Sequence, residues 1–431
     1  MKPSAIRTSC CPAHDPCPRH LRADIAAAAM DRARAVDGAS PEALEQALDA
    51  RGVSRRGLLS LTAAGASATA FAVGAPRTAQ AGQAAQAGQS SAAAVFGKPT
   101  GKTHVLPSTK DTVRVGTMDP AAPTALEIES GDVVHYPDTW VNWANEAKYG
   151  MGFAEREPIR KRYPQGPYSL IGPVVVRGAE PGDIIECRII RTRPIEWGWN
   201  SAPKGVGALP ADFDEPYLRY VKFDADRRFG QFADGVKIPL APIQGVIAAQ
   251  PAGDKPVSAI LSGAYGGNIV LRELVEGTAL FLPVQTPGAR LWTGDSHAAQ
   301  GDGVVDQTAI ETAMEDLRIQ YVLHKASPLA GPIAETPAAW IVMGFAPTLE
   351  DALTASLRQT IDWLSGATGL PKADVYALCS ISGSFRITQY SHQTGSNYTS
   401  IPAKAVHGVL PKAVFSADRL AQISASVRGR A

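Results

Sequence analysis

The chain has 431 residues and an almost balanced charge, with 42 Lys and Arg against 41 Asp and Glu and a formal net charge of +1. No basic block stands out beyond residues 156–162, so we expect no nucleic-acid partner. Beyond residue 81, no stretch reaches the roughly 18 uninterrupted apolar residues that a membrane helix needs. We therefore expect a soluble mature protein with no stable membrane anchor.

Residues 1–81 have the features of an export leader. Ser54-Arg55-Arg56-Gly57-Leu58-Leu59 is a twin-arginine pattern, an Ala-rich apolar run follows, and Ala79-Gln80-Ala81 is a small-x-small cleavage site. The alternative is a short N-terminal helix with chance arginines. We expect passage through the twin-arginine translocon, cleavage after Ala81 and a periplasmic or secreted mature protein.

A Cys/His-rich tract precedes the arginines. It could bind a metal transiently, but a short leader with no core to hold the ligands favours disorder. The tract contains Cys10, Cys11, His14, Cys17 and His20.

The mature chain is long enough for a large core, and we expect two closely joined portions. Residues 82–98, rich in Ala, Gln, Gly and Ser, predict a flexible linker. A β-rich region is expected at 99–345, and an α+β region packed on the same unit at 346–431. Only Cys187 and Cys379 remain after the leader, and buried free thiols are favoured over a disulfide.

The strand content comes first along the mature chain. The 33 prolines and 40 glycines are typical of many short strands joined by turns. Between residues 183 and 191, Ile185, Cys187 and Ile189 alternate with Glu186 and Arg188, which predicts a strand with one buried face. Strand-like segments lie at 125–136, 170–177, 183–191, 257–261 and 278–292.

Helical patterns appear only after residue 346. Thr348 begins a segment of capping-box type, and an amphipathic helix is predicted before Gly366. A shorter helix is predicted at 372–378 and a strand at 384–390. The apolar positions of the first helix are Leu349, Leu353, Leu357, Ile361 and Leu364. Together the elements predict a mainly β fold, sandwich or barrel-like, with a smaller α+β portion.

The run Gly-Asp-Ser-His-Ala-Ala-Gln-Gly-Asp-Gly at 294–303 concentrates reactive side chains among small residues. Because strand residues recur with period two, Asp295 and His297 can face the same way. Imidazole and carboxylate are a usual ligand set for zinc and similar ions, and the glycines let the backbone approach a ligand. The alternative is that both residues are caps or turn formers.

This run resembles the hallmark of the acetamidase/formamidase family, a group of small-amide hydrolases. The family pattern reads approximately Gly-Asp-x-His-Ala-Ala-Gln-Gly-Asp-Gly-Glu, followed by a Thr-Ala-Ile-Glu-like segment that corresponds here to 308–311. The similarity extends from about Gly101 to about Lys412. It implies the same β-rich architecture and the hydrolysis of a small amide to a carboxylate and ammonia. Other similar segments are 172–183, 266–268, 274–277, 334–336 and 385–389.

The resemblance also implies site residues. Asp295, His297 and Asp302 are candidate metal or acid/base groups, and Gln300 and Asn268 are candidate donors to the substrate carbonyl. The full predicted set comprises the catalytic residues Asp295, His297, Gln300 and Asp302, the substrate-binding residues Gly267 and Asn268, and the metal ligands Asp138, Asp295, His297 and Asp302. Asp138 follows Pro137 and could instead be a turn residue. The expected cofactor is a divalent metal such as zinc, and the expected partners are a small amide and further copies of the chain.

Two positions depart from the family pattern. Val304 stands where the family commonly has Glu, and Val270 where it commonly has Asp. Losing two carboxylates would change the charge and metal preference of the site. We favour an exported amide hydrolase of altered specificity over a weakened family member that binds a ligand or acts as a periplasmic scaffold.

Other reactive side chains have no clear partners in the sequence. No Gly-x-Ser-x-Gly elbow is present, and Ser382 is better interpreted as a turn or strand-edge residue. Surface or capping roles are favoured for His392 and His407. The tryptophans Trp140, Trp143, Trp197 and Trp199 could wall a pocket, although core packing explains tryptophans more often.

Overall fold

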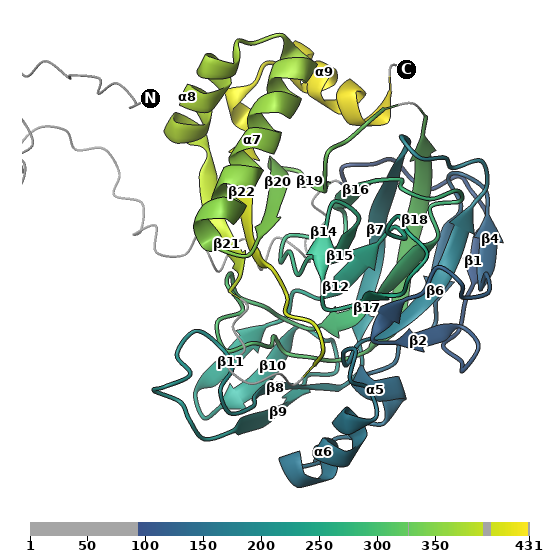
Figure 1. The fold of residues 1–431 in the computed structure, drawn as a ribbon, viewed down its shortest axis with the longest axis vertical. Helices are drawn as coiled ribbons and strands as arrows, with labels where there is room; N and C mark the ends of the chain where they lie inside the picture. Colours follow the sequence, from purple (N-terminus) through teal and green to yellow (C-terminus); the bar gives the residue numbers. More distant parts are fainter. Residues whose placement is uncertain (1–93, 326, 391–397, 430–431) are drawn as a thin grey trace, which may run out of the picture. The chain divides into compact units, whose positions relative to one another are not determined.

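The computed structural model describes residues 94–325, 327–390 and 398–429. The predicted leader, its Cys/His-rich tract, most of the linker and His392 lie outside these ranges. Among the described residues, no helix is both long and apolar enough to cross a membrane. Figure 1 shows strands as the dominant element, with helices gathered at two places.

The largest sheet has nine strands in the order β1-β5-β18-β7-β16-β19-β20-β22-β21. Its neighbours are antiparallel apart from the β1–β5 pair. The strands are β1 (Thr103–Val105), β5 (Val133–Tyr136), β18 (Met314–His324), β7 (Ile184–Pro194), β16 (Ala279–Pro283), β19 (Ile333–Glu335), β20 (Ala339–Ala346), β22 (Lys404–Pro411) and β21 (Ser384–Gln389).

A seven-stranded sheet runs in the order β14-β15-β12-β17-β6-β2, with β4 beside β6. Its strands are β14 (Ser262–Gly263), β15 (Gly266–Asn268), β12 (Ile243–Ala248), β17 (Leu291–His297), β6 (Ser169–Val176), β2 (Val113–Val115) and β4 (Leu126–Ile128). The main hydrophobic core takes side chains from both sheets, for example Cys187 and Ile319 from the larger and Ile171 and Leu291 from the smaller. The two sheets therefore form a β-sandwich, as the sequence predicted.

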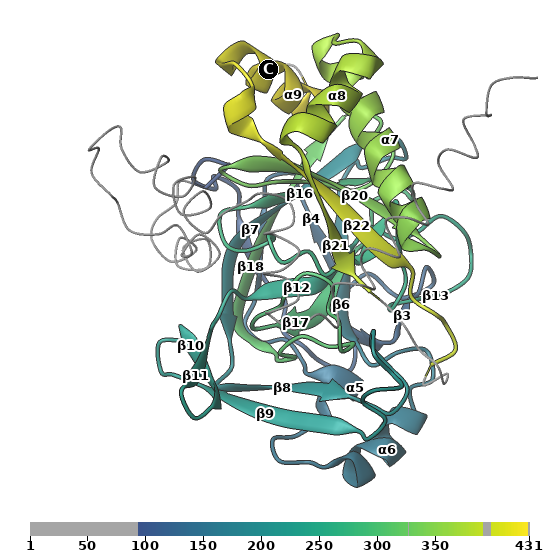
Figure 2. The same cartoon turned by 90° about the vertical axis from the view of Figure 1, so that its left-hand side faces the viewer.

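Smaller elements surround this sandwich. A four-stranded sheet contains β8 (Trp197–Ala202), β9 (Tyr217–Phe223), β10 (Phe229–Ala233) and β11 (Val236–Pro239), and β3 (Thr117–Met118) pairs with β13 (Val257–Ser258). The sequence did not predict the helices α5 (Asn142–Asn145), α6 (Phe153–Lys161) and α9 (Ala417–Arg428), or the short 3₁₀ turn at Lys412–Val414. In Figures 1 and 2, α5 and α6 lie near β8 and β9, at the end of this unit opposite the C-terminal helices.

The helices α7 (Leu349–Thr368) and α8 (Lys372–Ser382) confirm the predicted helical segments. Thr348 caps α7 by accepting a hydrogen bond from Asp351 N at 3.1 Å. The helix continues past Gly366 to Thr368, and Gly369 follows as its C-cap with φ of 72°. Figure 2 shows α7 alongside β20 and β22. Ser382, predicted in a turn or strand edge, is instead the last residue of α8.

The predicted apolar face of α7 is only partly its buried face, because Leu364 is buried and Leu357 and Ile361 pack against a core cluster, whereas Leu353 is exposed. The buried positions are Ala352, Ser356, Thr360, Leu364 and Thr368, so a stripe rich in small and hydroxyl side chains faces the sheet. The helix backbone comes so close to β20 that a Cβ at Gly344 would overlap the backbone of α7. Hydroxyls satisfy polar groups at this contact, where Ser356 donates to Val342 O at 2.9 Å. Small and hydroxyl-bearing residues beside the predicted apolar positions therefore make the closest contact with the sheet.

Several strand predictions also change in detail. The segments 125–136 and 278–292 each divide into strands of different sheets, and 257–261 forms only the short strand β13. The strand predicted at 183–191 exists as β7, but Glu186 on its expected polar face is fully buried. Arg428 of α9 covers that face and pairs with Glu186 at 2.6 Å.

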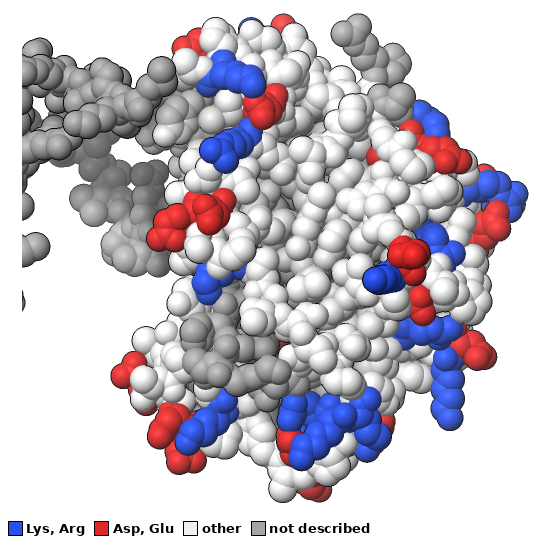
Figure 3. Space-filling model, in the orientation of Figure 1, with Lys and Arg blue, Asp and Glu red and all other residues white. Residues whose placement is uncertain are grey.

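Cys187 and Cys379 are buried free thiols, as predicted. On the face in Figure 3, acidic and basic side chains are interspersed around a largely uncharged centre. This mixture agrees with the near-zero formal charge of the whole chain.

Candidate functional site

The buried strand β17 carries Asp295 and His297. All its residues are buried, and it lies between β12 and β6 in the seven-stranded sheet. Asp295 has φ of 56°, a left-handed conformation that Asp tolerates better than most residues. On the adjacent strand, a Cβ at Gly245 would overlap Oδ2 of Asp295. A glycine opposite therefore makes room for the buried carboxylate.

Asp295, His297 and Glu311 converge on one point. Nε2 of His297 lies 3.3 Å from Oδ2 of Asp295 and 3.3 Å from Oε1 of Glu311. The three residues are between 2% and 5% exposed. Glu311 reaches the site because the chain returns after β17 and forms isolated bridges with His297 and Trp199. The predicted convergence of Asp295 and His297 is confirmed, and Glu311 joins them.

Gln300 fixes the orientation of the His297 ring. Its Nε2 donates to the carbonyl of Val270, which leaves Oε1 to accept from Nδ1 of His297 at 2.8 Å. With the proton assigned to Nδ1 by this network, Nε2 of a neutral His297 directs its lone pair toward the two carboxylates. Both ends of the Gln300 amide are therefore engaged within the protein. Gln300 orients His297 instead of donating to a substrate as predicted.

The electrostatics of this group favour a cation at its centre. Burial raises the pKa of Asp295 to about 7. Burial alone would lower the pKa of His297, but the charges of Asp295 and Glu311 outweigh it and hold that pKa well above its ordinary value. Burial opposes ionisation of Glu311, yet the positive His297 lowers its pKa. The group thus holds either a protonated His297 or another cation in the place of the Nε2 proton.

Three ligand-type atoms in this group lack hydrogen-bond partners among the described residues. They are both carboxylate oxygens of Asp295 and Nε2 of His297, all buried. Buried polar atoms are normally satisfied, so atoms of this kind that converge indicate a missing charged partner. Together with Glu311 they form a candidate three-residue metal set.

His297 and Glu311 line a cavity of about 150 Å³. Aromatic walls surround them, including Trp143, Tyr168 and Trp199. Two of the four tryptophans considered above therefore do line a pocket. The other two, Trp140 and Trp197, pack against core clusters.

The predicted substrate-binding residues differ in position. Asn268 lines the cavity and is buried, with Nδ2 donating to Ile260 O at 3.2 Å and Oδ1 without a partner in the described structure. Its available atom is thus an acceptor, where the sequence analysis expected a donor. Gly267 is buried in β15, where a Cβ would overlap Leu261 O, and it does not line the cavity.

Asp302 and Asp138 do not join Asp295 and His297. Asp302 accepts from Nη1 of Arg386 at 3.1 Å, and Asp138 accepts from the backbone N–H of Ser108 at 3.2 Å. The predicted metal set therefore lacks two of its four members. The contact of Asp138 is with a residue 30 positions earlier, so it is not the local turn contact of the alternative interpretation. Glu311, and not Asp302, is the second carboxylate beside His297.

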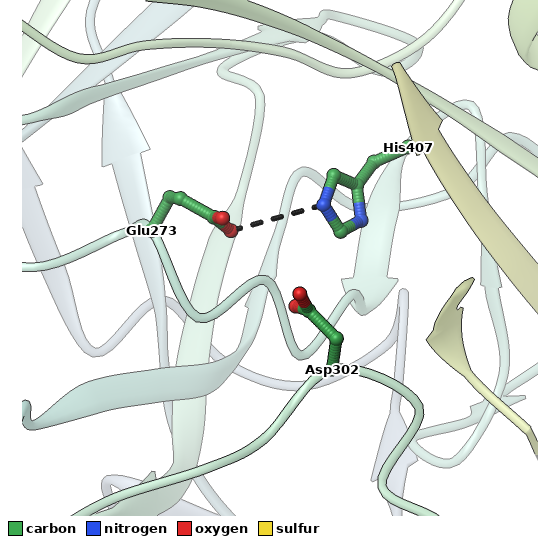
Figure 4. A group of neighbouring side chains, drawn as sticks. All are labelled: Glu273, Asp302 and His407. Atoms are coloured by element: carbon green, nitrogen blue, oxygen red, sulfur yellow. Dashed lines mark ion pairs between the residues drawn. The ribbon is translucent and has the colours of Figure 1, made fainter. Parts of the chain in front are cut away.

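Asp302 belongs to a second histidine–carboxylate group with Glu273 and His407, which Figure 4 shows pointing toward one another. Arg386 spans both carboxylates, with Nη2 donating to Glu273 at 2.8 Å. His407 is fully buried in β22, and its Nδ1 lies 2.8 Å from the Thr388 hydroxyl. The predicted surface or capping role for His407 was wrong, because β21 and β22 enclose its ring at the sheet.

The pKa of the histidine in the second group is shifted in the opposite direction from that of His297. Burial, then the nearby Arg386 and Arg272, lower the pKa of His407 to about 3. Burial raises the pKa of Glu273. His407 is therefore neutral, and the arginines neutralise the carboxylates.

The sandwich and its aromatic pocket define a mainly β protein with a buried histidine–carboxylate site. Residues 256–417 match the model of the Acetamidase/Formamidase family, which confirms the resemblance that the motifs indicated. A candidate formamidase of Schizosaccharomyces pombe is 28% identical over 195 residues, covering 32% of this chain and 47% of the relative. The formamidase of Methylophilus methylotrophus is 25% identical over 189 residues, covering 32% and 46%. The chain thus spans about half the length of these curated relatives.

Solved structures resemble a larger share of the chain. An acetamidase from Yersinia enterocolitica superposes with a TM-score of 0.65 at 25% identity, covering 75% of this chain and 96% of the other. An acetamidase from Bacillus halodurans gives a TM-score of 0.64 at 24% identity, covering 72% and 98%. The fold is therefore that of solved acetamidases.

Proposed function

We propose that the protein is an exported hydrolase that converts a small carboxylic amide to a carboxylate and ammonia, assisted by a divalent metal. The observation that carries this proposal is the convergence of Asp295, His297 and Glu311 at a cavity of about 150 Å³. Dry protein cavities of about 150 Å³ hold molecules the size of benzene. An amide of few heavy atoms therefore fits.

The donor set suits a divalent metal. Asp295, His297 and Glu311 would hold it, and three protein ligands leave positions for water and substrate, as in catalytic zinc sites. The unpartnered atoms of Asp295 and His297 are those that a metal would contact. Gln300 supplies the hydrogen bond to the other ring nitrogen that metal-bound histidines usually have. When bound, such a metal lowers the pKa of water and polarises a carbonyl.

The chain's own residues supply the remaining requirements. Glu311 lines the cavity, and Asn142 Nδ2 donates to its Oε2 at 3.2 Å, which leaves Oε1 beside His297. With Oε1 bound to the metal, the carboxylate can still accept a proton from the attacking water at Oε2 and deliver it to the leaving nitrogen. Oδ1 of Asn268 can accept a hydrogen bond from the substrate NH₂ group. The aromatic walls limit the access of further water.

The two valines support altered specificity. Val270 and Val304 both line the cavity, with φ of 38° and 43°. A β-branched residue in this left-handed region is strained, and such strain is often found at functional sites. Apolar side chains at both positions suit an amide larger than formamide, whose carbon chain can lie against this part of the wall.

A direct assay tests the proposal. The mature protein from residue 82 would be purified, its metal content measured, and ammonia release followed with formamide, acetamide, propionamide, butyramide and benzamide. We expect metal to copurify and at least one amide to be hydrolysed. A protein that holds metal and binds amides without ammonia release would support the alternative, a ligand-binding member of the family.

Export rests on the twin-arginine pattern of residues 54–59 and the Ala79-Gln80-Ala81 cleavage site. The twin-arginine route carries folded proteins, which suits an enzyme that acquires its metal before export. Replacing Arg55 and Arg56 by Lys should retain the protein in the cytoplasm. An unchanged extracytoplasmic yield, measured by cell fractionation, would contradict export by this route.

A further inference from the structure

Arg156 of α6 is a buried cation in the wall of the same cavity. It is 3% exposed, and its Nη2 donates to the Tyr220 hydroxyl at 2.7 Å. Its guanidinium carbon lies 4.7 Å from the centroid of the Trp199 ring. Within the described ranges no carboxylate forms an ion pair with Arg156, and its Nε has no hydrogen-bond partner. Among the described residues, Nη2 is the one guanidinium nitrogen of Arg156 that donates a hydrogen bond.

A neighbouring arginine shows the usual arrangement. Arg160, one helical turn later, forms two hydrogen bonds with Glu157, at 2.8 and 2.7 Å. Arg156 is more deeply buried than Arg160, yet it has only aromatic faces and a neutral hydroxyl as direct partners.

The observed contacts offset only part of the cost of burying this charge. Removing a cation from water is costly, and the direct partners of Arg156 are two aromatic rings and one hydroxyl group, none of which carries a negative charge. Burial lowers the pKa of Arg156, and Tyr220 and the charge of Glu311 counteract this effect only in part. A negative group in the cavity would supply the missing partner.

Arg156 and the catalytic group share the cavity through Trp199. The Trp199 ring stacks against Arg156, and its backbone N–H donates to the carbonyl of Glu311 at 2.9 Å. One molecule of a few heavy atoms can therefore contact both the guanidinium and the His297–Glu311 pair. A guanidinium binds a carboxylate through two parallel hydrogen bonds, which fixes the orientation of the bound molecule.

We propose that the substrate is an amide that also carries a carboxylate, namely the half-amide of a short dicarboxylic acid, and that Arg156 binds the carboxylate. This inference rests on the proposed amide hydrolysis. In the reaction, water adds its oxygen to the amide carbon, the C–N bond breaks, and the nitrogen takes one proton of the water and leaves as ammonia. The second proton of the water is lost from the new carboxylic acid and converts ammonia to ammonium. The carboxylate on Arg156 is unchanged, so the product is a dicarboxylate. The cavity size restricts the substrate to about two to four carbons.

Matched substrates test the inference. In malonamate and succinamate, a carboxylate replaces the terminal methyl group of propionamide and butyramide. We expect the wild-type protein to hydrolyse each half-amide with a kcat/KM at least about 10-fold higher than that of its methyl analogue, because hydrogen bonds to charged groups contribute about 1.5–3 kcal/mol. Arg156→Met should lower kcat/KM for the half-amides by about 10- to 100-fold and change the methyl analogues by less than about 3-fold.

Two further measurements keep the test decisive. Malonate and succinate should bind the wild-type protein in calorimetry, Arg156→Met should abolish this binding, and Arg156→Lys should weaken it. Arg162→Met is the matched control, because Arg162 is an exposed arginine that pairs with Glu146 beside the same helix. It should leave both substrate preference and dicarboxylate binding unchanged. Should Arg156→Met fail to fold, the wild-type preference and the lysine variant still decide.

The failures of the two proposals are distinguishable. A wild-type preference for the methyl analogues, or an equal loss of both substrate types in Arg156→Met, would overturn the role of Arg156 and leave amide hydrolysis standing. Absence of ammonia from every amide would overturn the hydrolase proposal. Dicarboxylate binding that depends on Arg156 would then still assign the carboxylate site, whereas its absence would remove that as well.

Discussion

Two groups in this protein combine a buried histidine with two carboxylates, and they differ in what neutralises the carboxylates. Around His297 no arginine or lysine pairs with Asp295 or Glu311 in the described structure, so the histidine itself or a metal must supply the positive charge. Around His407, Arg386 bonds to both carboxylates. Residue types alone therefore do not define a metal site, because the neighbouring cations decide whether one can form.

The same difference separates the candidate metal site around His297 from the ion-pair network of Arg386 with Glu273 and Asp302. A divalent ion beside Asp295 and Glu311 would be attracted by their negative charges. An ion beside Glu273 and Asp302 would also be repelled by Arg272 and Arg386. The second group instead connects β21 to the loop that carries Asp302, only five positions beyond His297. We infer that it positions the site loop.

The largest expected effect contrasts one carboxylate from each group. Glu311→Gln removes the negative charge that would bind a metal and accept a proton from water. We therefore expect a loss of kcat/KM of about 10²- to 10⁴-fold and a fall in metal content. Asp302→Asn, the matched isosteric change, should reduce kcat/KM by less than about 10-fold and leave the metal content unchanged. Elemental analysis and amide kinetics check both. Equal losses of metal in the two variants would erase the distinction.

Glu186, a buried carboxylate outside both groups, shows by the pH dependence of stability how paired cations act on a buried acid. Glu186 is paired with Arg428, Arg188 and His324, and although burial opposes its ionisation these partners lower its pKa from 4.5 to about 2. A carboxyl group whose pKa is lower in the folded than in the unfolded protein stabilises the fold at pH values above the unfolded pKa. This stabilisation is lost as the pH falls from about 4.5 toward 2. The full contribution corresponds to about 3 kcal/mol.

Glu186→Gln isolates this contribution. The difference in unfolding free energy between wild type and variant, measured by urea denaturation, should be largest above pH 5 and shrink as the pH falls to 2.5. A difference that stays constant over this range would show that the pairing of Glu186 does not contribute through its charge.

Disrupting the ion-pair network of Arg386 with Glu273 and Asp302 should cause a smaller loss of stability. Arg386→Met leaves Glu273 and Asp302 without their shared cation, and because these side chains are partly exposed we expect about 2 kcal/mol of destabilisation. Adding Glu273→Gln and Asp302→Asn should recover part of it. Metal content is the second readout, and it should remain unchanged. A loss of metal equal to that in Glu311→Gln would instead mean that this ion-pair network is part of the metal site.

The sequence predicted the sandwich and half of the site for identifiable reasons. The period of two along β17 was enough to place Asp295 beside His297, although Asp295 is in a left-handed conformation. Glu311 could not be placed from spacing, because it depends on how the chain returns to pair with Trp199; its only signal was the Thr-Ala-Ile-Glu segment. The place of Asp302 in the second group could not be foreseen, because its partner Arg386 lies 84 positions later in the chain.

The smallest expected effect concerns the two valines of the cavity wall. The metal set is complete without acids at these positions, so the double change Val270→Asp with Val304→Glu should leave the metal content unchanged. Asp tolerates the left-handed conformation at position 270 better than Val, which offsets part of the cost of placing carboxylates in an apolar wall. We therefore expect a net destabilisation of about 1 kcal/mol. The relative kcat/KM for acetamide over butyramide should rise by about 10-fold, because the more polar and more crowded wall disfavours the longer chain.

The single change Val305→Glu at an exposed neighbouring valine is the matched control and should alter neither ratio nor stability. A rise in metal content in the double variant would mean that the two positions belong to a depleted metal site, and the difference between the two histidine groups would then extend to the cavity wall.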